Sequence, residues 1–163
     1  MRSARSVLVP IALCLAAPLP GCTGPAAVTD ADVSAFRRVA EDYQQLYMDG
    51  GENCEQIVRV LAEDIRMLEN GEAWSHEQME QYCPYLPHKE VLSSWADFDV
   101  VRSDVAYDFA TTVYQVEENP PGRETVARVW EKIGGEWKIV RMTSVRGASP
   151  QPASDQPAGA ADG

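Results

Sequence analysis

The sequence predicts one α+β domain in which three helices come first and a run of antiparallel strands follows. Between residues 29 and 83, apolar residues recur at the spacing of amphipathic helices, in segments that open with capping residues. From residue 91 onward the spacing changes to the period of two that is typical of strands, and turn sequences separate the runs. We therefore expect the helices to pack on one curved sheet.

The first two helices are predicted by their caps and their apolar positions. Thr29 and Asp32 form a capping box, and the helix that they open should end at Gly50-Gly51. Asn53 can cap a second helix, in which apolar residues stand at positions 57, 58, 60 and 61.

The next segment is predicted to contain a small strand and a third helix. The segment of residues 64–68 is short and contains branched side chains, and it precedes the turn sequence Asn70-Gly71, so we expect a strand there. Ser75, with a glutamine three residues later, indicates another capping box. The helix that follows should run to about Cys83, because Pro84 stops it.

The second half of the domain is predicted to be a meander of long strands. Gly134-Gly135 is a hairpin signal between the last two of them. The expected strands cover residues 91–101, 105–116, 125–133 and 136–145.

The first 22 residues have the plan of a secretory signal peptide. Two arginines precede an apolar run over residues 7–19, and Gly21 stands just before Cys22. This ending resembles the lipobox of bacterial lipoproteins, in which the cysteine is acylated and becomes the new N-terminus. The resemblance implies an exported protein that is anchored by lipid in the cell envelope, in the periplasm or on the outer surface. Secretion without a lipid, after cleavage elsewhere, is the alternative.

These features divide the chain into four parts. A leader (1–22) and a tether (23–28) precede the folded domain (29–146), and a tail (147–163) follows it. The tail is rich in Pro, Ala and Gly and has no large apolar residue, so we expect it to be disordered.

The charge of the chain restricts its partners. Without the leader, 12 basic side chains stand against 25 acidic ones, a formal charge of −13. Such acidity argues against nucleic acid and against docking on anionic lipid headgroups. The lipid on Cys22 would therefore be the chief attachment to the membrane.

Two cysteines remain after Cys14 and Cys22 are assigned to the leader and to the lipid. Cys54 and Cys83 are an even pair in an oxidising compartment, and we predict a disulfide between them. A bridge across about 30 residues would stabilise the fold by roughly 3–4 kcal/mol. A reactive thiol is the alternative, and the pair lacks the histidine pattern of a zinc site.

Parts of the domain resemble a known family. Residues 36–50 and 57–65 resemble the opening of nuclear transport factor 2-like, SnoaL-like domains. Residues 128–140, with the ending Trp-Lys-Ile-Val, resemble their last hairpin, and the likeness spans about residues 32–146. It implies a cone of three helices wrapped by a strongly curved sheet. It also implies a pocket that opens into the cone and dimerisation through the sheet.

The ketosteroid isomerase branch of that family suggests catalytic candidates. The resemblance places Tyr43 where those enzymes hold an oxyanion donor and Glu69 where they hold a carboxylate base. Residues 127–129 stand where a second, protonated acid belongs, and none of them is an acid. Glu69 could be a general base in an apolar pocket or a solvent-facing carboxylate beside a turn.

Three aromatic residues, Tyr43, Tyr47 and Trp74, are the candidates for ligand binding, and core packing is the alternative use of their rings. No zinc signature, phosphate loop or basic stripe is present, so we predict no cofactor and no metal. The first hypothesis is a lipid-anchored module that binds a small apolar ligand or peptide. The others are an isomerase or dehydratase that uses Glu69 and Tyr43, and a structural or assembly protein of the envelope.

Overall fold

The computed structural model describes residues 27–148. The predicted leader, most of the tether and the tail beyond Ala148 lie outside these residues. The helices are α1 (Asp30–Asp49), α2 (Cys54–Val60) and α3 (His76–Tyr82), with short 3-10 turns at Gly51–Asn53 and Cys83–Tyr85. The strands are β1 (Leu61–Glu69), β2 (Glu72–Trp74), β3 (Glu90–Arg102), β4 (Val105–Gln115), β5 (Gly122–Ile133) and β6 (Glu136–Ala148).

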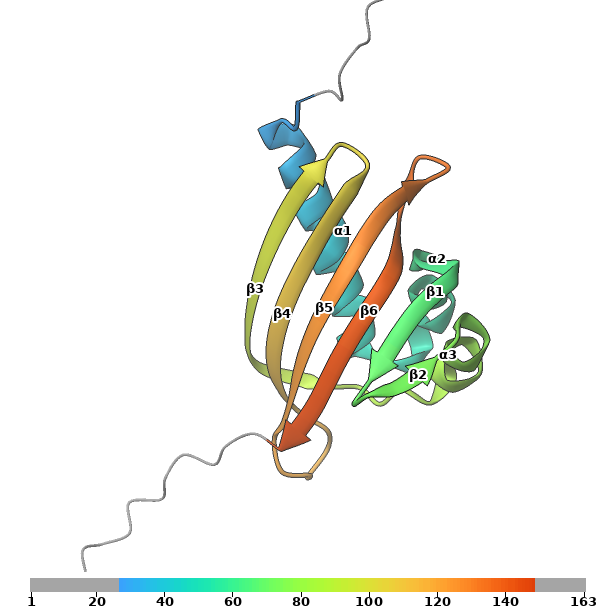
Figure 1. Cartoon of the computed structure of the whole chain (residues 1–163). Coiled ribbons are helices and arrows are strands. Elements are labelled where there is room, and N and C mark those ends of the chain that lie inside the picture. Colours follow the sequence, from blue (N-terminus) through green and yellow to red (C-terminus); the bar gives the residue numbers. More distant parts are fainter. Residues whose placement is uncertain (1–26, 149–163) are drawn as a thin grey trace, which may run out of the picture.

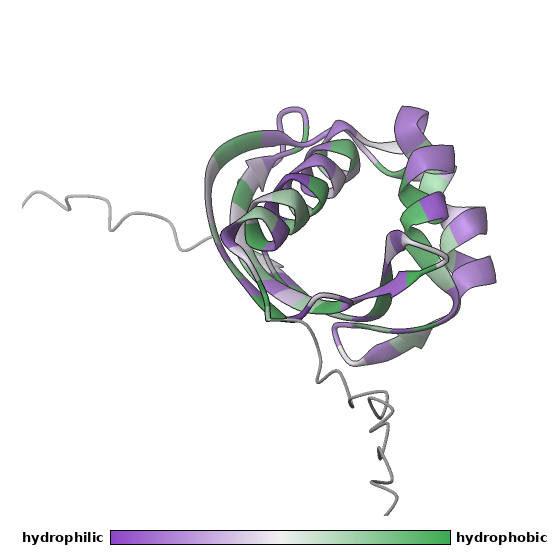
Figure 2. Ribbon diagram, turned by 90° about the horizontal axis from the view of Figure 1, so that it is seen from above, coloured by the Kyte–Doolittle hydropathy of each residue, from purple (hydrophilic) through white to green (hydrophobic). Residues whose placement is uncertain are grey.

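All six strands form one curled sheet in the order β2-β1-β6-β5-β4-β3. Neighbours are antiparallel except β1 and β6, which run parallel. The sheet curls around α1, while α2 and α3 lie at the side that ends in β1 and β2 (Figures 1 and 2). This confirms the predicted α+β cone of helices and curved sheet.

Local sequence explains the ends of α1. The Thr29 hydroxyl accepts from the Asp32 backbone N–H, and the Asp32 carboxylate accepts from the Thr29 N–H, as the predicted capping box requires. Gly50 ends the helix at φ 96°, in the region that favours glycine. A Cβ on Gly51 would lie 2.3 Å from the Pro84 carbonyl oxygen, so glycine permits the close approach of the segment after α3.

Several element boundaries differ from the prediction, and β5 begins at Gly122, three residues before the expected start at 125. β1 begins at Leu61 and not at residue 64, so Leu61 pairs with Ile139 of β6 instead of closing the second helix. The tertiary pairing overrides the helical spacing at this position. β6 continues to Ala148, two residues past the expected end of the domain.

The core lies between α1 and the concave face of the sheet. Phe36 is fully buried, and its ring lies 5.7 Å from Trp130 of β5 and 5.1 Å from Trp137 of β6. No helix within residues 27–148 is long and apolar enough to span a membrane.

Candidate functional site

Two cavities lie between the helices and the sheet. The first, the inner cavity, leaves only about 20 Å³ free, which is room for about one water molecule. The second, the α1–β3 groove, has a volume of about 450 Å³. Gln44 of α1 and Arg128 of β5 line both of them.

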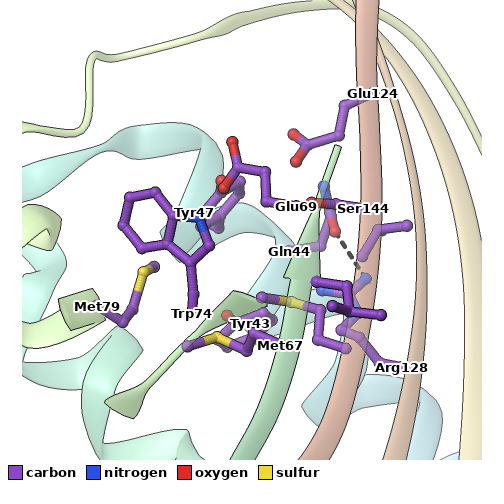
Figure 3. A pocket seen from close by; sticks show the side chains of 13 residues that line it. Tyr43, Gln44, Tyr47, Met67, Glu69, Trp74, Met79, Glu124, Arg128 and Ser144 are labelled. Carbon is purple, nitrogen blue, oxygen red and sulfur yellow. Dashed lines mark hydrogen bonds between the residues drawn. The ribbon is translucent and has the colours of Figure 1, made fainter. Parts of the chain in front are cut away.

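The inner cavity brings together the four residues that the sequence singled out. Tyr43 and Tyr47 come from α1, Glu69 from the end of β1 and Trp74 from β2 (Figure 3). Helical spacing places both tyrosines on the face of α1 that packs on the sheet. The candidates are therefore neighbours in space, although their roles as ligand-binding or catalytic groups stay predictions.

Glu69 lies in a network of charges and is not a free carboxylate. Its Oε1 is 2.6 Å from Nη1 of Arg146. The same guanidinium donates through Nε to Glu124 at 3.1 Å and through Nη2 to the hydroxyl of Tyr47. Glu124 in turn pairs with the buried Lys89 at 3.5 Å. Burial lowers the pKa of Lys89 and raises that of Tyr47. Because two cations meet two carboxylates, this cluster is balanced in formal charge.

Tyr43 has an unusual hydroxyl. Among the described residues it is the only buried side-chain polar atom without a hydrogen-bond partner. Burial raises the pKa of the phenol, and the guanidinium of Arg128 lies 5.2 Å from the centre of its ring. An unpaired buried donor loses the hydrogen bonds of water and is therefore ready for a polar group that enters the cavity.

A second buried pair, Arg128 and Asp108, stands where β4 and β5 face the helix. Oδ2 of Asp108 accepts from Nε of Arg128 at 3.1 Å and from Nη2 at 2.8 Å. Nη2 also donates to Gln44 at 2.7 Å, and Trp130 Nε1 donates to the other carboxylate oxygen at 2.5 Å. The hydrogen bonds of Arg128 to described residues thus use its Nε and Nη2 but not its Nη1. The two N–H donors of Nη1 are therefore left for a ligand.

The groove exists because small side chains of the sheet face α1. Ser94 and Ala96 of β3 pair with Thr112 and Ala110 of β4, so four short residues stand side by side. They cannot fill the space beneath the helix, where Met48 and other residues of α1 form the opposite wall.

Comparison with known proteins supports the fold. No family model and no curated protein matches the sequence. Among solved structures, an NTF2-like protein of unknown function from Pseudomonas putida gives a TM-score of 0.61 at 14% identity, covering 80% of this chain and 94% of that one. A protein of unknown function with a cystatin-like fold from Nostoc punctiforme gives 0.58 at 18% identity, over 77% and 97% of the chains. A scytalone dehydratase-like protein from Novosphingobium aromaticivorans gives 0.52 at 15% identity, over 81% and 96%.

The described domain has the nuclear transport factor 2-like (NTF2-like) fold. At these identities the likeness establishes the fold alone. Within this NTF2-like domain, Arg128 occupies the segment in which the resemblance to ketosteroid isomerases asks for a protonated acid. A guanidinium stays charged at neutral pH and cannot take that role.

The cysteine pair of the NTF2-like domain lies close together beside the core. Burial, together with the neighbouring thiol of Cys54, raises the pKa of Cys83 to about 12. Both cysteines are free in the structure. The structure therefore places Cys54 next to Cys83, and the disulfide itself stays a prediction.

Proposed function

We propose that this NTF2-like domain binds a small apolar ligand or peptide segment in the α1–β3 groove. The observation that carries the proposal is the groove of about 450 Å³, since pockets for small ligands measure about 300–1,000 Å³. Ala40, Met48 and Phe98 give it apolar walls, and Arg128 gives it a polar floor. The inner cavity, with about 20 Å³, is too small for an organic ligand.

The floor favours a ligand with a neutral oxygen acceptor over a carboxylate. Nη1 of Arg128 has donors that no described residue uses, but Asp108 already neutralises the guanidinium charge. A second carboxylate would therefore add an uncompensated buried charge, which is costly.

A saturation experiment with the neutral dye Nile red tests the proposal. We expect the fluorescence of the dye to rise with one site per domain. Ala96→Phe, which fills the groove, should abolish the signal. Ala127→Phe on the exposed outer face of β5 is the matched control and should leave it intact. Equal binding by both variants would place the dye elsewhere and would remove the basis of the proposal.

Catalysis in the inner cavity is the second candidate, because the unpaired hydroxyl of Tyr43 and the carboxylate of Glu69 line the same space. One of the fold neighbours is a scytalone dehydratase-like protein, which supports a catalytic role for this cavity. The ion pair of Glu69 with Arg146 weighs against it, since a paired carboxylate is a weaker base. Glu69→Gln should abolish any isomerase or dehydratase turnover that is detected, and unchanged turnover would exclude Glu69 as the base.

We further propose that the domain is exported and held at the membrane by a lipid on Cys22, with Leu19-Pro20-Gly21-Cys22 as the supporting sequence. Cys22→Ser should move the protein from the membrane fraction to the soluble fraction. Unchanged membrane association of that variant would contradict the lipid anchor.

A further inference from the structure

Among the strands of residues 27–148, β3 is an edge strand, and α1 packs against its concave face. It is the last strand in the sheet order and pairs only with β4 (Figure 1). Between its two register shifts, at Val91/Ser93 and Val100/Arg102, backbone N–H and C=O groups of β3 point alternately toward β4 and toward the open side. An open edge of this length is a template for an added strand.

The α1–β3 groove reaches this open edge. Side chains alternate between the two faces of a strand, and the pairing partners place Ser94, Ala96 and Phe98 toward α1 and place Trp95 and Asp97 on the outer face. All five line the groove nevertheless. A groove lined by residues of both sets reaches the backbone of β3 beside this edge, where the Phe98 N–H already donates to the Asp97 carboxylate at 3.0 Å.

The outer side of the edge is acidic and has no basic partner. Asp97 and Asp99 stand opposite Phe109 and Tyr107 of β4, and neither carboxylate forms an ion pair with a described residue. Trp95, two residues earlier, is 58% exposed. Two antiparallel copies of β3 paired through these residues would oppose carboxylate to carboxylate, which destabilises cross-strand pairs. The edge therefore favours a foreign strand with basic residues over a second copy of this chain.

We propose that the edge of β3 binds an extended peptide of a partner protein in which apolar residues alternate with lysine or arginine. The peptide adds to the sheet as a seventh strand through backbone hydrogen bonds. Its apolar side chains enter the groove beneath Ser94 and Ala96, and its basic side chains stand opposite Asp97 and Asp99. This inference rests on the proposed function, because it names the class of ligand that occupies the groove.

An acetylated, amidated heptapeptide of alternating valine and lysine is the probe, titrated by calorimetry at low salt. A matched peptide with glutamate in place of lysine tests charge. A version with N-methyl groups on alternate backbone nitrogens tests strand pairing. We expect the lysine peptide to bind and both controls to bind at least tenfold more weakly. Equal affinity of either control, or no binding of the lysine peptide, would overturn the proposal.

Variants of the domain locate the site. Asp97→Asn together with Asp99→Asn should weaken the lysine peptide about fivefold and flatten the dependence of its affinity on salt. Asp104→Asn, in the exposed turn after β3, is the matched control and should change nothing. Ala96→Phe should weaken the peptide as well, because it fills the groove. An unchanged affinity in the double aspartate variant would contradict the assigned register.

The Nile red titration separates this inference from the function on which it rests. One outcome is that the dye binds saturably, Ala96→Phe abolishes this binding, and the peptide does not bind. The groove would then stand as an apolar ligand site, and the peptide proposal would be overturned. Failure of both dye and peptide would overturn the two proposals together. Sedimentation velocity tests whether a second copy of the chain occupies the edge. A dimer that persists in Ala127→Phe but dissociates in Ala96→Phe would identify that second copy as the occupant. It would overturn the proposal of a foreign peptide.

Discussion

Replacing Asp108 by asparagine should destabilise the domain strongly, because it leaves the guanidinium of Arg128 buried without a counter-charge. The side chains of Arg128 and Asp108 are only 2% and 1% exposed, so water in the groove solvates little of the remaining cation. Breaking a buried pair on one side costs about 3–5 kcal/mol, a large part of the total stability of about 5–15 kcal/mol. For a domain of this size we expect a fall in melting temperature of about 10–20 °C.

Urea denaturation followed by circular dichroism measures this loss. Asparagine keeps one oxygen, which can accept either from Trp130 Nε1 or from Arg128, and its NH2 group then faces the other donor, so the change removes the charge and one acceptor together. The double variant Asp108→Leu with Arg128→Met should recover part of the stability, because it removes both charges but leaves Trp130 Nε1 without its acceptor. Glu136→Gln, in an exposed ion pair with Arg59, should leave the midpoint unchanged. A loss below about 1 kcal/mol in Asp108→Asn would refute the claim that the guanidinium depends on this carboxylate.

Three further outcomes are expected. Gly51→Ala should lower the free energy of unfolding in urea by about 1–3 kcal/mol, because the new Cβ would overlap the Pro84 carbonyl. Gly147→Ala is the control and should change it by no more than about 0.5 kcal/mol, because the space around Gly147 is open. Tyr43→Phe should not destabilise the domain at pH 7, because the hydroxyl has no hydrogen-bond partner to lose. Burial raises the pKa of the Tyr43 phenol in the folded state, so its contribution to stability is complete below the unfolded-state pKa and is lost as pH rises. Tyr43→Phe should therefore flatten the loss of stability above about pH 10. If Cys54 and Cys83 form a disulfide, the exported protein should show no thiol that reacts with Ellman's reagent under denaturing conditions. Reduction of the bond should lower the free energy of unfolding by roughly 3–4 kcal/mol. Two reactive thiols would contradict the disulfide.

The elements of this fold could be predicted from sequence because their signals are local. Both capping boxes, at Thr29 and Ser75, consist of side chains three residues apart that bond to each other's backbone. The turn at Gly134-Gly135 likewise needs only two residues with positive φ. The start of β1 could not be predicted in this way, because its first residue pairs with a strand 78 residues away.

The candidate site was predictable only in part, for the same reason. Helical spacing showed that Tyr43 and Tyr47 face the sheet, and both line the inner cavity. The partners of the charged groups are distant in sequence: Asp108 meets Arg128 across 20 residues, and Lys89 meets Glu124 across 35. Alternation along β4 and β5 could have flagged Asp108 and Arg128, because the neighbours two residues away on either side are buried. It could not have told which charges pair.

The distribution of these charges limits what the domain can bind. Inside the cone the two buried clusters are each balanced, one through Arg128 and Asp108 and the other through two cations and two carboxylates. A ligand that reaches the floor of the groove is therefore best accommodated when its inner part is apolar or neutral. At the edge of β3, by contrast, Asp97 and Asp99 have no basic partner, so positive charge is favoured there. A ligand that matches both regions has an apolar side and a basic side, and a strand with alternating residues presents the two on opposite faces.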